Sequence, residues 1–61
     1  MNNKILRLKQ VVEMTGTSKT TIYRWINAGT FPKPINLSHV SVGWLEADIN
    51  DWIQSKVEAR G

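Results

Sequence analysis

The chain has 61 residues, a net charge of +3, three Trp and no Cys. A chain of this length forms one small domain, which buries only about 60% of its unfolded surface and has marginal stability. The absence of Cys excludes a disulfide framework and a thiolate metal site. No apolar run reaches the ~18–20 residues of a membrane span, and the N-terminus carries no signal-peptide core, so we expect a cytoplasmic protein.

Charge is distributed unevenly along the chain. Residues 1–34 carry six Lys and Arg against one Glu, a net charge of +5, whereas residues 35–61 carry two Lys and Arg against four Asp and Glu, a net charge of −2. A basic half beside an acidic half indicates one side that faces a polyanion and another that faces water or protein.

The first expected helix covers about residues 8–14, after a short extended piece at 5–7. Its apolar arc starts at Leu8 and continues with two valines. Valines are mediocre helix formers, so tertiary packing must stabilise this helix. Gly16 can adopt the left-handed conformation that ends a helix.

The second expected helix covers residues 19–28. Ser18 stands at the N-cap position, where its hydroxyl can accept a hydrogen bond from the backbone N–H of Thr20 or Thr21. Gly29 stands just past the end of the helix. A helix, a turn of three to four residues with Gly, and a second capped helix form the helix-turn-helix pattern.

The two faces of this second helix differ in chemistry. Ile22, Trp25 and Ile26 fall within one apolar arc. The opposite face and its flanks contain no acid between residues 18 and 30 and carry Lys19, Thr20, Tyr23, Arg24 and Asn27. Such groups hydrogen-bond to phosphates and base edges, and Arg and Asn have bidentate partners on guanine and adenine. The alternative interpretation is an ordinary solvated helix face.

The next residues, 30–34, cannot form a regular helix, because each Pro lacks an N–H and drives its predecessor toward extended conformations. We expect Phe31 to fill the core beside Trp25. Alternation with a period of two then predicts a small β-hairpin at about 35–44. Residues 35–37 pair with a second strand that begins at Val40 or Ser41 and ends at Trp44, around a turn at 38–39.

The last expected helix covers residues 46–58. Its apolar arc comprises Leu45, Ile49, Trp52, Ile53 and Val57. The opposite face is acidic, and we expect it to face water or a protein partner instead of DNA. The elements together predict a mainly α fold with a small β-hairpin, a winged helix-turn-helix of three helices and a two-stranded wing, in a single domain over residues 1–61.

The sequence offers little for catalysis. His39 is the only His, on an expected loop tip, and metal binding needs further ligands. Asp48 and Asp51 lie three residues apart on the exposed side of a helix, where the helix dipole and solubility explain them. The chain has no Gly-rich phosphate loop, no Ser/His/Asp set and little room for a ligand pocket. We therefore expect a non-enzyme without cofactor or metal.

From about Leu6 to Ile53 the chain resembles the AlpA-type phage and prophage regulators, which overlap with small excisionases of the MerR-like winged-helix class. The resemblance rests on three stretches, RLKQVVEMTGTSKTTIYRWINAGTFPKPI, VGW and DINDWI. It implies a DNA-binding transcription factor or recombination directionality factor of a mobile element, bound near an attachment site or an integrase promoter. The wing departs from the family pattern, because Ser38-His39 stands where Gly and Arg are usual, which predicts weaker wing contact.

The second helix of such proteins enters the major groove of double-stranded DNA. The resemblance maps this role onto Ser18, Lys19, Thr20, Thr21, Tyr23, Arg24 and Asn27. Lys33 and His39 are expected to follow the DNA backbone along the hairpin. Because so small a domain has a limited footprint, we expect cooperative self-association on DNA or a protein partner such as integrase. The alternative hypothesis is a protein-interaction module that docks on an integrase or repressor without reading DNA.

Overall fold

Three helices and three short strands make up residues 4–60, the part of the chain that the computed structural model describes. The elements follow the order β1 (Ile5–Leu6), α1 (Leu8–Thr15), α2 (Lys19–Ala28), β2 (Ile35–Asn36), β3 (Val42–Leu45) and α3 (Glu46–Ala59). The three predicted helices are confirmed, and the first and last each end one residue later than expected. The mainly helical fold with a β wing is that of a winged helix-turn-helix.

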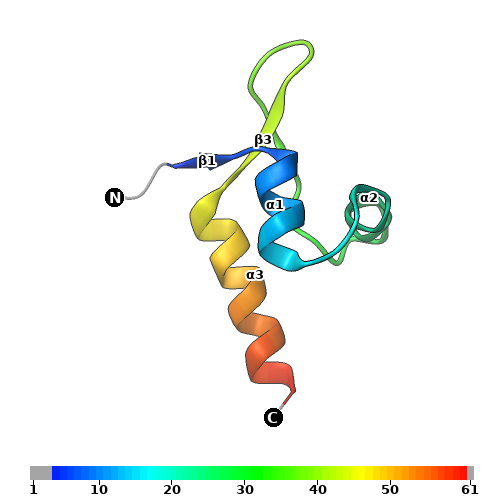
Figure 1. Cartoon of the computed structure of the whole chain (residues 1–61), viewed down its shortest axis with the longest axis vertical. Coiled ribbons are helices and arrows are strands. Elements are labelled where there is room, and N and C mark those ends of the chain that lie inside the picture. Colours follow the sequence, from blue (N-terminus) through cyan, green and yellow to red (C-terminus); the bar gives the residue numbers. More distant parts are fainter. Residues whose placement is uncertain (1–3, 61) are drawn as a thin grey trace.

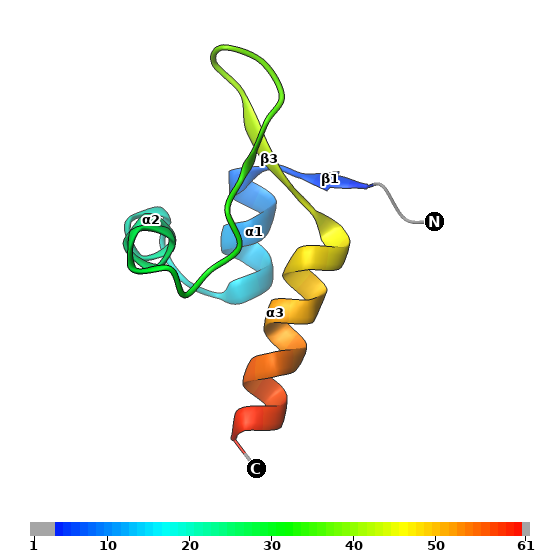
Figure 2. The ribbon, with the colours of Figure 1, turned by 180° about the vertical axis from the view of Figure 1, so that it is seen from behind.

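The elements are arranged along a long axis with α2 projecting from its middle (Figure 1). The molecule measures 40 × 30 × 20 Å along its principal axes. The loop of the hairpin lies at one end of the long axis and the C-terminal end of α3 at the other, and α1 lies beside the first half of α3 (Figures 1 and 2). The second half of α3 extends beyond the end of α1.

The sheet has one strand more than the predicted two-stranded wing. Its order is β1-β3-β2, with both pairs antiparallel. Leu6 of β1 lies opposite Trp44 of β3, and the backbone N–H of Glu46 donates to the carbonyl of Lys4 at 2.9 Å. The short extended piece expected before the first helix is therefore a strand that joins the N-terminal part of the chain to the start of α3.

The predicted hairpin is confirmed, and its pairing starts at Ser41, the second of the two expected starts. Ile35 lies opposite Gly43, and the N–H of Leu37 donates to the carbonyl of Ser41 at 2.8 Å. Val40, the other expected start of the second strand, lies in the loop and is 93% exposed. Alternation identifies the buried face of a strand but not its partner residues, because the register also depends on the length of the loop.

The core lies where the sheet meets the helices. Its buried side chains come from β1, α1, α2, the 30–34 segment, β3 and α3, and each is at most 5% exposed: Leu6, Val11, Ile22, Phe31, Trp44 and Ile49. Trp44 donates its indole N–H to the carbonyl of Pro32 at 2.9 Å. Val57, predicted in the apolar arc of the last helix, is 47% exposed, because that part of α3 extends beyond α1.

Gly43 lies where three strands approach closely, which generates a stability prediction. A Cβ at this position would lie 2.5 Å from Cγ2 of Ile5 and 3.1 Å from the backbone oxygen of Leu6. Because the strand backbone cannot shift freely, we expect Gly43→Ala to lower the free energy of unfolding by about 1–3 kcal/mol. Thermal unfolding followed by circular dichroism measures the loss. Val40→Ala, in the exposed loop of the same hairpin, should change little, and equal stability of the two variants would contradict the packing argument.

Candidate nucleic-acid interface

The turn between α1 and α2 is built from local interactions that the sequence encodes. Gly16 ends α1 in the left-handed conformation, with φ 68°, and its N–H donates to the carbonyl of Val12 at 2.9 Å. Ser18 is the N-cap of α2, as predicted, and its Oγ accepts from the N–H of Thr21 at 3.2 Å. Gly29 ends α2 with φ 78°. These contacts fix where α2 begins and ends.

Most of the side chains predicted to contact DNA project from α2 into solvent. Ile22 is fully buried, and Trp25 and Ile26 are half-buried against the core. The exposed side chains of α2 include Lys19, Thr20, Tyr23, Arg24 and Asn27. The amphipathic division predicted for this helix is therefore confirmed, and its outer face presents two cations, a hydroxyl, a phenol and an amide.

Two of the predicted contact residues have a structural role at the helix start. Thr21 is half-buried, and the Ser18 hydroxyl donates to its Oγ1 at 3.0 Å. Both side chains are thus engaged in the cap. At the same end of α2, the backbone N–H groups of the first turn lie where a helix N-terminus attracts anions.

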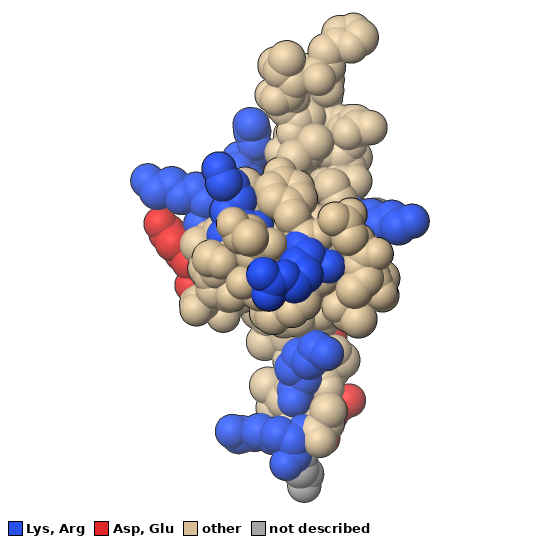
Figure 3. Space-filling view, turned by 90° about the vertical axis from the view of Figure 1, so that its right-hand side faces the viewer, with Lys and Arg blue, Asp and Glu red and all other residues tan. Residues whose placement is uncertain are grey.

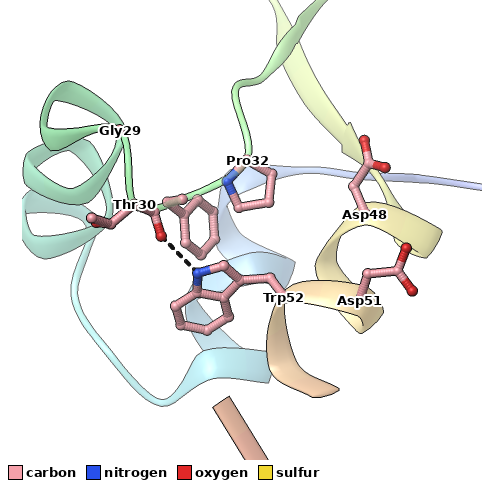
Figure 4. Close-up of a pocket in the computed structure, with 7 residues that line it drawn as sticks. Gly29, Thr30, Pro32, Asp48, Asp51 and Trp52 are labelled. Atoms are coloured by element: carbon pink, nitrogen blue, oxygen red, sulfur yellow. Dashed lines mark hydrogen bonds between the residues drawn. The ribbon is translucent and has the colours of Figure 1, made fainter. Parts of the chain in front are cut away.

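An aromatic cluster of Trp25, Phe31 and Trp52 holds α2 against α3. The Phe31 and Trp52 rings meet edge to face at 4.8 Å between centroids, and the Trp25 ring lies 5.5 Å from that of Trp52 and 6.1 Å from that of Phe31. Trp52 also donates its indole N–H to the carbonyl of Thr30 at 2.8 Å (Figure 4). Sequence reasoning paired Phe31 with Trp25 but did not identify Trp52 as the third member.

Lys and Arg side chains gather around α2. Figure 3 views the molecule from the side on which α2 projects, and Lys and Arg appear over the middle of this face and around it, whereas Asp and Glu appear only near its margins. Within residues 4–60, Lys19 and Arg24 form no ion pair with an Asp or Glu. Their charges are therefore available to an anionic partner.

The remaining predicted contacts lie outside α2. Lys33 is exposed in the segment that follows α2, and His39 is exposed in the hairpin loop. That loop occupies one end of the long axis (Figure 1). The structure therefore does not gather all the predicted residues into one cluster: those of α2 share one element, while Lys33 and His39 extend the candidate surface toward the hairpin.

Two acidic residues of α3 lie near the segment that follows α2. Asp48 and Asp51 are exposed and line a shallow pocket together with residues 29–32 and Trp52, and both carboxylates point away from the Trp52 indole (Figure 4). Among residues 4–60, no group of three or more His, Cys, Asp or Glu side chains is placed to hold a metal ion. No helix in this part of the chain is both long and apolar enough to cross a membrane.

These features define a winged helix-turn-helix protein with a basic, acid-free second helix. The chain belongs to the family described as prophage CP4-57 regulatory protein (AlpA), which matches residues 4–57.

Two relatives cover most of the chain. It is 42% identical over 66 positions to the DNA-binding transcriptional activator AlpA of Escherichia coli (strain K12), a match that spans 92% of this chain and 94% of that protein. It is 32% identical over 57 positions to the uncharacterized protein ORF88 of Enterobacteria phage P4, over 93% of this chain and 65% of that protein. The resemblance inferred from the sequence is therefore confirmed.

The N-cap of α2 generates a second stability prediction. Ser18→Ala removes the acceptor for the N–H of Thr21, so we expect the free energy of unfolding to fall by about 0.5–2 kcal/mol. Ser18→Asn keeps a side-chain oxygen that caps equally well, and its midpoint in urea should match that of the unchanged protein. Equal destabilisation by both substitutions would show that Ser18 contributes something other than the cap.

Proposed function

We propose that this protein binds double-stranded DNA in a sequence-specific manner and regulates transcription, excision of a prophage, or both. The observation that carries the proposal is the exposed outer face of α2, which has two cations and no acid. The family and the printed name of the 42% identical relative, a DNA-binding transcriptional activator, support the same function. The candidate DNA sites are an attachment region and an integrase promoter.

In this proposal α2 lies in the major groove. Arg24, near the middle of the helix and free of acidic partners in the described chain, contacts a base edge or a phosphate, and Asn27, Thr20 and Tyr23 lie on the same exposed side. Lys19 and the N-terminal turn of α2 hold a phosphate. Lys33 and the hairpin loop with His39 follow the DNA backbone. The chemistry needs no metal or cofactor, and we propose that the protein is not an enzyme.

The size of the domain indicates that one copy alone cannot provide high specificity. A single small module buries roughly 600–1,000 Å² on DNA. We therefore propose that several copies bind cooperatively to repeated sites or that integrase assists. Stepwise shifts in a gel, which appear together over a narrow range of protein concentration, are the expected result. A single, non-cooperative complex would contradict this part of the proposal.

A specific observation favours one rival function. The outer face of α3 is acidic, with Asp51 and Glu58 exposed, and suits a protein partner. In this alternative function, the domain docks on an integrase or repressor and does not read DNA. Reversal of both charges, Asp51→Lys with Glu58→Lys, would then abolish function, whereas Arg24→Ala would be harmless.

The first experiment measures binding of purified protein to the attachment region and the integrase promoter, against unrelated DNA, at ~150 mM salt. Arg24→Ala should weaken specific binding by about 1–3 kcal/mol, roughly 5- to 150-fold, and reduce the preference over unrelated DNA. The charge-reversal variant of α3 is the control and should retain specific binding. Equal, weak binding of the unchanged protein to every fragment would overturn the DNA-reading proposal, and the fragment that shifts separates excision from transcription.

A further inference from the structure

The face of α3 that packs on the core changes from apolar to basic where the helix leaves the core. Ile49 is buried and Trp52 and Ile53 are half-buried. At 100° per residue, Lys56 and Arg60 fall on the same stripe as these three residues. Both are exposed, because α3 extends beyond the end of α1 (Figure 1). The stripe that faces α1 and α2 along the first half of α3 thus ends in two cations.

Contacts place these cations on the side of the molecule that carries α2. Nζ of Lys56 lies over the Trp52 ring, 5.5 Å from its centroid, and that ring contacts Trp25 of α2. Lys56 and Arg60 also line a groove together with Met14 and Thr15, the residues that precede the turn into α2. A continuous path of side chains therefore connects α2 to the C-terminal end of α3.

The space-filling view agrees with these contacts. In Figure 3, which views the face that carries α2, Lys and Arg side chains also appear toward the end of the molecule opposite the hairpin. The only Lys or Arg in the second half of α3 is Lys56, and Arg60 is the C-cap residue directly after the helix. Cations on both sides of a helix that occupies the major groove are suited to the phosphates of the two strands that border the groove.

We propose that Lys56 and Arg60 form a second phosphate-binding site, at the end of α3, which contacts the DNA strand on the side of α2 opposite the hairpin. This inference rests on the proposed function. It assigns α3 a role in DNA binding although the outer face of this helix is acidic. The two roles are compatible because Asp51 and Glu58 lie on the other side of the helix from Lys56.

The helix dipole alone does not explain where these cations stand. Cations near a helix C-terminus are favourable on any face of the helix. Lys56 and Arg60 instead share the stripe that faces the rest of the molecule, and Nζ of Lys56 lies over the Trp52 ring. A Lys ammonium over the face of a Trp ring is attracted by the negative charge of that face. The Trp52 ring therefore helps to orient Lys56 toward the DNA-facing side.

The test compares two variants that change the net charge equally and on the same helix. Lys56→Gln with Arg60→Gln removes the proposed site, and Asn50→Asp with Gln54→Glu adds two negative charges at exposed positions outside the stripe. Affinity for the specific site and for unrelated DNA is measured at several salt concentrations. Each lost phosphate contact lowers the salt slope by about 0.9, so the first variant should lose about 1.8 from the slope. If the two proteins bind equally at 1 M salt, this difference in slope corresponds to a roughly 30-fold weaker affinity of the variant at 0.15 M salt. The loss should be the same on the specific site and on unrelated DNA.

Hydroxyl-radical footprinting adds a positional readout. The Lys56 and Arg60 variant should lose backbone protection at one edge of the footprint, whereas the control variant should keep both edges and its slope. An unchanged slope and footprint in the first variant, with specific binding and its sensitivity to Arg24→Ala intact, would overturn this inference alone. Absence of specific binding by the unchanged protein would instead overturn the proposed function.

Discussion

The position of α2 depends on the aromatic cluster of Trp25, Phe31 and Trp52. A short turn with a left-handed glycine joins α2 to α1, and one fully buried side chain, Ile22, anchors the helix in the core. The three rings add large apolar contacts of defined geometry, and the bond from Trp52 to the carbonyl of Thr30 fixes the segment after α2 to α3. The cluster therefore determines how far α2 projects from the core. It also determines which side of α3 lies on the same face of the molecule as α2.

Local physics explains which parts of the fold were predictable from the sequence. The N-cap at Ser18 and the glycines after α1 and α2 act through hydrogen bonds and backbone angles within a few residues, so spacing alone revealed them. The pairing of β1 with β3 depends on contacts between distant segments. The partnership of Trp52 with Trp25 belongs to the same class, because helical periodicity assigned each to an apolar arc but not to each other.

The same distinction applies to the candidate site. Periodicity identified the exposed face of α2, since one helix face packs on the core and the other side chains must face solvent. Periodicity also assigned Val57 to the core, because the helical stripe continues to the end of α3. The apolar stripe of α3 is buried only where α1 lies beside it. The point at which burial ends therefore depends on the lengths and positions of both helices. The sequence pattern therefore predicted which side chains share a face of each helix, and the structure showed how much of the apolar face of α3 is buried.

The central place of β3 in the sheet has a consequence for the order in which the protein is made. β1 is synthesised first, yet its partner β3 is separated from it by both helices of the helix-turn-helix and by β2. Contacts between segments so distant in sequence must overcome the entropy of closing a long loop, so they form only once both segments are free to meet. A nascent chain that stops before residue 42 lacks the strand that joins its two ends. A truncated translation product therefore cannot assemble the sheet.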